Sequence, residues 1–230
     1  MCNQRVLLRE SKDLIICDLD MTLVETVFET GIYPSIVATI KEQGGTVLDI
    51  DITRDFWYMK YDWDTFIRER FGLDPAVFLP AFRLHDTPEF RMQHTRPFPH
   101  VIGALRKMQT LRKLLAIITF AKPNIADMEV ALLKIRFDEV LSLNDNSNFL
   151  GKNKPHPAGM QHVLEKLGIT KERAVYVGDS NSDGKFANNA EVDFVYFNER
   201  GDSLKSDIQV AATFSDWSAF PDLEIKPCFQ

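Results

Sequence analysis

Two aspartates one residue apart, Asp18 and Asp20, stand at the end of the apolar run Leu14–Cys17. A short apolar run before a polar break predicts a buried strand, whose end would bring both carboxyl groups to the rim of a sheet, where open α/β folds bind ligands. Carboxylates this close repel each other unless a divalent cation offsets their charge or one of them carries a proton during a reaction. The pair therefore indicates a metal site, acid–base chemistry, or both.

Later segments contain further residues that suit the same chemistry. Thr119 closes an apolar run, Lys154 precedes a proline, and Asp179 and Asp183 lie close together after a fourth run. The carboxyl ends of parallel strands meet at one edge of a sheet. We therefore expect these side chains to converge with the first aspartate pair.

The elements that would position these residues alternate along the chain. Short apolar runs are followed by polar residues and then by helix-like stretches, which predicts an α/β fold, a Rossmann-like parallel sheet with helices on both faces. The predicted strands are Leu14–Asp18, Leu114–Thr119, Glu139–Leu143, Ala174–Gly178 and Asp193–Phe197.

Between the first two predicted strands the pattern changes to helices. Pro34 opens a periodic stretch, and Asp74 before a proline has the N-cap pattern of another helix. From Thr53 to Phe71 the apolar residues recur at three- and four-residue steps, and Gly72 follows as a stop. We therefore predict a small helical bundle over residues 25–95, inserted into an α/β core of residues 1–24 and 96–230.

In order and spacing, the polar segments resemble the haloacid dehalogenase superfamily of phosphotransferases, over nearly the whole chain. The stretch 18–22, Asp-Leu-Asp-Met-Thr, resembles the family's Asp-x-Asp-x-Thr signature. Thr119 resembles the second motif, Lys154 with its proline the third, and Asp179 with Asp183 the fourth. The helical insert is similar to the mobile cap of the branch that contains phosphoglycolate phosphatase-like enzymes. Each motif alone is weak, whereas the ordered set of four is specific.

Phosphoryl transfer gives these residues distinct roles. A phosphate monoester is an anion, so a carboxylate nucleophile approaches it only when a metal ion and an ammonium group neutralise the charge. Asp18 would attack phosphorus and form an aspartyl phosphate, and Asp20 would serve as general acid and then as general base. Lys154 would screen the charge between nucleophile and phosphoryl group, and Thr119 would bind its equatorial oxygens.

Magnesium is the natural cation for a site that offers only oxygen ligands and touches a phosphate. Asp18 and Asp179 are the expected side-chain ligands. The resemblance implies that Asp20 adds its backbone carbonyl and that Asp183 binds the ion directly or through a water.

The sequence leaves the substrate open. In the cap, Trp57, Tyr58 and Tyr61 lie off the apolar stripe and are candidates for lining a substrate pocket. Met21 stands where the family often has glycine, and Phe120 stands where many relatives carry Asn or Ser. Both differences affect the shape and polarity of the pocket.

The composition excludes several other classes. The balance of 27 basic and 33 acidic residues gives a net charge of −6, which does not favour nucleic acid as a partner. No apolar stretch approaches the roughly 20 residues that span a bilayer. Three cysteines without a spaced framework indicate a reducing compartment, so we expect a cytoplasmic protein without a membrane partner.

The sequence thus predicts a Mg²⁺-dependent phosphatase acting on a small phosphorylated metabolite. A dehalogenase is disfavoured because Asp20 supplies an acid–base group that a halide leaving group does not need. Two alternatives remain: a phosphomutase, which shares every core residue, and a non-catalytic phospho-acceptor or binding module. The oligomeric state is not indicated.

Overall fold

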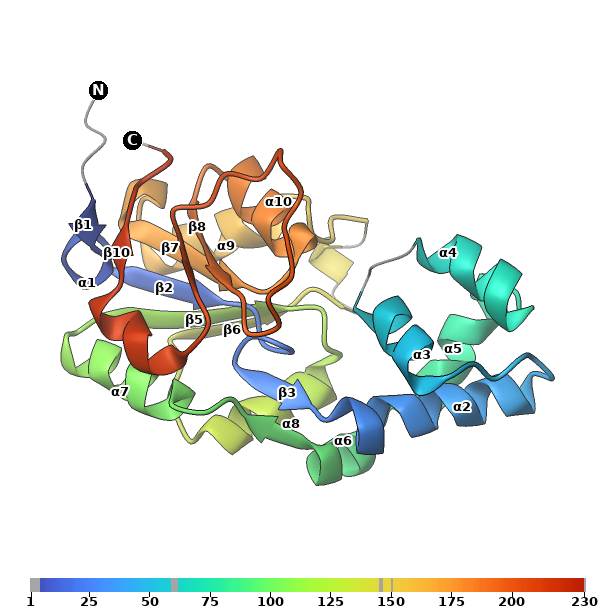
Figure 1. Cartoon of the computed structure of the whole chain (residues 1–230). Helices are drawn as coiled ribbons and strands as arrows, with labels where there is room; N and C mark the ends of the chain where they lie inside the picture. Colours follow the sequence, from blue (N-terminus) through green and yellow to red (C-terminus); the bar gives the residue numbers. More distant parts are fainter. Residues whose placement is uncertain (1–4, 59–61, 145–146, 150, 230) are drawn as a thin grey trace. The chain divides into compact units, whose positions relative to one another are not determined.

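The computed structural model describes residues 5–58, 62–144, 147–149 and 151–229. The chain forms two compact units, one of Met1–Glu25 with Pro97–Gln230 and the other of Thr26–Arg96. Figure 1 shows the first as an α/β unit and the second as a helical unit. No helix in the described part of the chain is long and apolar enough to cross a membrane.

The α/β unit is built on a six-stranded sheet in the order β6-β5-β2-β7-β8-β9, with all neighbours parallel. The five strands predicted from the sequence are present, two of them one residue shorter than predicted. The sixth strand was not predicted, because it has only three residues and only one of them is buried. The strands are β2 (Leu14–Cys17), β5 (Leu114–Thr119), β6 (Glu139–Ser142), β7 (Ala174–Gly178), β8 (Asp193–Phe197) and β9 (Ala212–Phe214).

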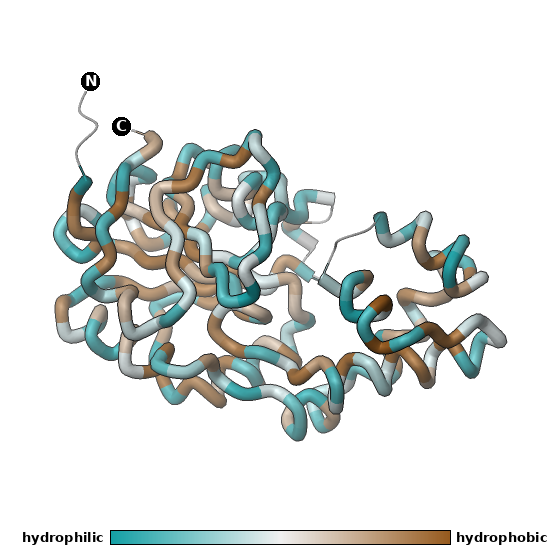
Figure 2. The backbone as a smooth tube through the Cα atoms, viewed as in Figure 1, coloured by the Kyte–Doolittle hydropathy of each residue, from teal (hydrophilic) through white to brown (hydrophobic). Residues whose placement is uncertain are grey.

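Both faces of this sheet are buried under helices. Ile15 and Cys17 of β2 belong to one hydrophobic cluster, which contains residues of α7 (Val101–Thr110) and α8 (Pro123–Leu133). The alternate strand residues belong to a second cluster with α9 (Ala158–Leu167) and α10 (Asn181–Asn189). A strand covered on both faces is hydrophobic throughout, which is why β2 reads as an uninterrupted apolar run. Figure 2 shows this hydrophobic character along the central strands.

Short elements complete this unit. Strands β1 (Val6–Leu7) and β10 (Glu224–Ile225) pair in antiparallel fashion, and α1 (Leu8–Ser11) follows β1. At the two points where the chain passes between the units, β3 (Val24–Thr26) and β4 (Thr95–Pro97) form a two-stranded sheet.

The helical unit encloses its own aromatic core, in which Phe56, Phe71 and Phe78 are almost fully buried. The periodic stretch that begins at Thr53 is two helices rather than one, because the carboxylate of Asp62 accepts the N–H of Thr65 and caps a new helix. The helices are α2 (Tyr33–Glu42), α3 (Ile50–Trp57), α4 (Trp63–Phe66), α5 (Pro75–His85) and α6 (Pro88–His94). A π-helical segment, Ile67–Phe71, follows α4 and ends at Gly72, whose φ of 70° is left-handed.

Candidate active site

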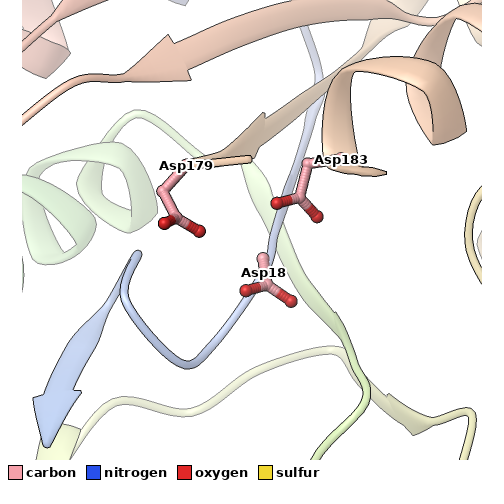
Figure 3. A group of neighbouring side chains, drawn as sticks. All are labelled: Asp18, Asp179 and Asp183. Carbon is pink, nitrogen blue, oxygen red and sulfur yellow. The ribbon is translucent and has the colours of Figure 1, made fainter. Parts of the chain in front are cut away.

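Three carboxyl groups meet at the carboxyl edge of the sheet. Asp18 follows β2 and donates its backbone N–H to the carbonyl of Val177 at 2.9 Å, so the strand ladder fixes its position. Asp179 directly follows β7, and Asp183 lies in the first turn of α10. Each of the three offers a carboxylate oxygen within 4.8 Å of the others. Figure 3 shows the three groups facing a common space.

Lys154 bridges two of these carboxylates from a buried position. Its Nζ lies 2.6 Å from Oδ1 of Asp18 and 2.9 Å from Oδ1 of Asp183, and its side chain is 2% exposed. Burial alone would lower the pKa of Lys154, but the charges of the two aspartates outweigh it and hold the pKa above its usual value. The site therefore contains a fixed ammonium group in contact with Asp18.

Three aromatic rings surround this ammonium group. The centroids of Tyr176, Phe186 and Phe120 lie 5.2, 5.7 and 5.9 Å from Nζ of Lys154. Electron-rich ring faces attract a cation and exclude water from it. Phe120 also presents 39% of its surface to solvent. Phe120 thus adds an exposed apolar ring beside Lys154.

The carboxylate of Asp183 is engaged on both oxygens. Oδ1 accepts from Lys154 and from the Tyr176 hydroxyl at 3.1 Å, and Oδ2 accepts from the Ser180 hydroxyl at 2.5 Å and the Ser180 N–H at 3.2 Å. The Ser180 hydroxyl in turn accepts the N–H of Asp183, which completes a capping box at the start of α10. Four donors fill the roughly four acceptor positions of a carboxylate.

Close packing around Asp183 gives a first testable prediction. A Cβ added at Gly178 would lie 2.5 Å from Cβ of Asp183, so Gly178→Ala must displace that aspartate. We expect the free energy of unfolding to fall by about 1–3 kcal/mol, and the activity of the site to fall with it, because overpacking forces neighbours out of place. Urea unfolding would measure the change. In the control Gly103→Ala, on α7, the added Cβ has no neighbour within 4 Å, so stability should stay level or rise by up to about 1 kcal/mol. A stable and fully active Gly178→Ala variant would contradict the prediction.

Burial shifts the pKa values of two site aspartates. Desolvation raises the pKa of Asp18 well above its usual value, against the lowering effect of Lys154. Desolvation and the charge of Asp183 raise the pKa of Asp179 to about 7, although Arg200 opposes the shift. Without a cation, the site therefore binds protons that an unfolded chain would release, since the unperturbed value for Asp is 3.8.

The raised pKa of Asp179 predicts how the stability of the metal-free protein depends on pH. Between about pH 4 and about pH 7 the folded protein holds a proton on Asp179 that the unfolded chain lacks, so the free energy of unfolding falls progressively across this range and levels off above about pH 7. Urea unfolding in EDTA across this range should show that Asp179→Asn loses less stability with rising pH than the unchanged protein. Parallel pH profiles for the two proteins would count against the shift.

The remaining predicted core residues lie on the same edge. Thr119 is 1% exposed at the end of β5, and its hydroxyl accepts the N–H of Ala121 at 3.1 Å. Asp20 lies close enough to Asp179 for its charge to raise that pKa. The loop that carries Asp20 contains Met21 at a φ of 60°, a left-handed conformation that glycine adopts without strain and that other residues rarely adopt.

The three predicted cap residues belong to the helical unit. Trp57 is half-buried and packs against Trp63 and Phe82, with ring centroids 5.6 and 5.4 Å away, so it joins the aromatic core despite lying off the predicted stripe. Tyr58 lies 6.0 Å from the ring of Phe28. Tyr61 lies outside the described residues. A substrate-binding role for these three stays a prediction.

Sequence reasoning missed two side chains that contact the site. Tyr176 reaches Asp183 from the middle of β7, where an apolar run gives no sign of a polar role. Arg200 contacts Asp179, with Nη2 2.9 Å from Oδ2. Its only sequence signal is its position shortly after the strand Asp193–Phe197, which places it at the same sheet edge.

The chain resembles known proteins over most of its length. The family model described as haloacid dehalogenase-like hydrolase matches residues 15–197. Pyrophosphatase PpaX of Oceanobacillus iheyensis is 26% identical over 174 residues, which cover 74% of this chain and 75% of that protein. A phosphoglycolate phosphatase of Psychrobacter arcticus is 30% identical over 135 residues, or 57% of either protein.

Solved structures share the fold at lower identity. A haloacid dehalogenase-like hydrolase of Streptococcus pneumoniae superimposes with a TM-score of 0.71 at 19% identity, covering 91% of this chain and 96% of its own. CbbY of Rhodobacter sphaeroides, solved in complex with phosphate, gives 0.68 at 17% identity, covering 92% of this chain and 100% of its own. These likenesses extend to nearly the full length of both chains in each comparison.

Proposed function

Since the chain belongs to the haloacid dehalogenase-like hydrolases, in the branch of the phosphoglycolate phosphatases, we propose that it cleaves a small phosphorylated metabolite through an aspartyl-phosphate intermediate with the help of Mg²⁺. The chain is a phosphoric monoester hydrolase. The observation that supports the mechanism best is the ammonium of Lys154 in contact with Asp18 beside two further carboxylates.

The first step of the proposed mechanism is attack by Asp18. One carboxylate oxygen forms a bond to phosphorus while the bond from phosphorus to the leaving oxygen breaks, and Asp20 gives that oxygen a proton. Lys154 reduces the repulsion between the attacking carboxylate and the anionic phosphoryl group, because its charge already lies 2.6 Å from Asp18. The Thr119 hydroxyl, which accepts from Ala121, is proposed to donate its proton to an equatorial oxygen.

The second step releases phosphate. Asp20, now deprotonated, takes a proton from a water molecule that attacks the phosphorus of the aspartyl phosphate. The bond between phosphorus and Asp18 breaks, and the nucleophile is regenerated. The same residue thus serves first as acid and then as base, which suits a carboxyl group that follows the nucleophile by two residues.

The donor set fits a hard divalent cation, because three carboxylates offer oxygens within 4.8 Å of one another. We propose that Asp18 and Asp179 bind Mg²⁺ through their side chains and Asp20 through its backbone carbonyl. Asp183 would bind the ion, directly or through a water, in exchange for one of the four protein donors that occupy its acceptor positions. When bound, the ion would neutralise charge on the phosphoryl group and the nucleophile.

The substrate class is proposed from relatives and from the second unit. Pyrophosphatase PpaX and the phosphoglycolate phosphatase of Psychrobacter arcticus act, by their names, on pyrophosphate and phosphoglycolate, which are small anions. We propose that the helical unit is the cap domain and that Trp57, Tyr58 and Tyr61 contribute to substrate choice. A substitution at any of them should change the ranking of substrates more than the rate on a generic aryl phosphate.

The proposed function is tested by phosphate release from 4-nitrophenyl phosphate, with MgCl₂ or with EDTA, followed by a panel that includes phosphoglycolate and pyrophosphate. We expect turnover with Mg²⁺, none in EDTA, and recovery when Mg²⁺ is restored. Phosphorylation of the protein without turnover would instead favour a phospho-acceptor. Transfer of the phosphoryl group to a second substrate hydroxyl rather than to water would favour a phosphomutase.

A further inference from the structure

Arg200 lies beside the carboxylate group in the loop after β8. Its Nη2 donates to Oδ2 of Asp179 at 2.9 Å, and its Nε donates to Oδ2 of Asp202 at 3.0 Å. The Arg200 and Asp179 side chains are 22% and 11% exposed. One planar guanidinium group thus bridges a residue of the sheet edge and a residue of its own loop.

The fold explains why these residues meet. Strands β7 and β8 are parallel neighbours, with Gly178 opposite Tyr196, so the segments that follow them emerge at the same edge. The Tyr196 hydroxyl donates to the backbone carbonyl of Asp202 at 3.0 Å, which ties the loop back to β8. The Arg200 guanidinium is therefore anchored to β8 through Asp202 and to the end of β7 through Asp179.

This contact restricts the orientation of Asp179. It engages one carboxylate oxygen, and a carboxylate has a second oxygen to offer a cation. A guanidinium group presents its donors in a fixed plane, so it limits rotation of its partner more than the single ammonium of a lysine would. Lys154 contacts Asp18 and Asp183, and Arg200 contacts Asp179, so each of the three carboxylates has a positively charged partner.

We propose that Arg200 is a positioning residue that holds Asp179 in the orientation needed to bind the divalent cation. Residues that orient a metal ligand commonly change metal affinity by about 10- to 100-fold when they are removed. The inference rests on the proposed function, because it assumes that Asp179 is a ligand. A competing role for Arg200 makes the opposite prediction: its charge would weaken metal binding, and its removal would make binding tighter.

Direct titration of the full-length protein with MgCl₂, by calorimetry and without substrate, distinguishes these roles. Arg200→Gln should bind Mg²⁺ at least about tenfold more weakly than the unchanged protein. Arg200→Lys should recover only part of the affinity, because it restores the charge but not the two-point contact. Asp202→Asn, which weakens the anchor of the guanidinium, should show a smaller loss.

A matched control is available at the opposite edge of the sheet. Arg173 also donates twice to an aspartate, with Nε and Nη2 2.7 and 2.8 Å from the carboxylate oxygens of Asp13, which precedes β2. Arg173→Gln removes the same charge and should leave Mg²⁺ affinity unchanged. Thermal unfolding in EDTA would establish that each variant is folded before it is titrated.

The outcomes separate the inference from the proposed function. If the unchanged protein binds no Mg²⁺, both the metal site and the role of Arg200 are overturned. If the unchanged protein binds Mg²⁺ and Arg200→Gln binds it equally well or more tightly, only the positioning role is overturned. A loss shared equally with Arg173→Gln would show an effect of net charge and would also overturn it.

Discussion

Replacing Asp18 with asparagine is expected to reduce phosphate release by at least about a thousandfold, because the amide has no anionic oxygen to attack phosphorus. Asparagine has nearly the shape of aspartate, so the variant should keep the packing at the end of β2. It also removes the carboxyl group of Asp18, whose pKa is raised by burial and by the charges of Asp183 and Asp179, so a group that is costly to ionise is lost. The metal-free variant should therefore be at least as stable as the unchanged protein.

Steady-state turnover of 4-nitrophenyl phosphate, together with urea unfolding, would separate the two effects of this substitution. Asp207→Asn is a suitable control, because Asp207 is exposed and pairs with Lys185 at the surface. It changes the net charge equally and should retain full activity. If Asp18→Asn kept more than about a tenth of the activity, Asp18 would not be the nucleophile, and another group would have to form the bond to phosphorus.

The second large effect is expected for Lys154→Ala, which should lower turnover by about 100-fold or more, as the loss of a preorganised charge stabiliser does elsewhere. The reason is local: the buried Lys154 ammonium contacts Asp18 and Asp183 and lies beside three aromatic rings, where water cannot replace it well. Its removal also leaves two buried carboxylates without their shared partner, which should reduce stability at neutral pH.

Lys152→Ala provides the matched control, because Lys152 is exposed two residues before Lys154. It should change neither activity nor stability appreciably. The turnover of Lys154→Ala must be compared at a temperature at which unfolding curves show that both variants are folded. A loss smaller than about tenfold under those conditions would contradict the proposed role of Lys154 in screening charge.

The parts of the fold that could be predicted from the sequence are those with a strong local signal. Leu14–Cys17 is buried on both faces, so its apolar run and the polar break at Asp18 mark the end of a strand clearly. Ala212–Phe214 carries no such signal, because this strand is short and partly exposed. In the region after Thr53 the sequence pattern is misleading instead, because the helical periodicity continues past Asp62, where the structure begins a new helix.

The candidate site divides in a similar way. Asp18, Lys154, Asp179 and Asp183 could be selected because they occur in an ordered set of segments that each follow or adjoin a strand. Tyr176 and Arg200 could not, because their importance comes from contacts made in three dimensions with Asp183 and Asp179. The number of hydrogen-bond donors around Asp183 could not be predicted from the sequence either, because it depends on the rotamers of Lys154 and Ser180.

The capping box at the start of α10 links secondary structure to chemistry. One carboxyl group, that of Asp183, both begins the helix through Ser180 and holds the ammonium of Lys154. Fraying of the first helical turn would therefore remove one of the two carboxylates that hold the lysine, so hydrogen exchange at these amides would report on the integrity of the proposed site. Directed evolution of this enzyme towards new substrates would have to leave that turn intact, whatever it altered in the second unit.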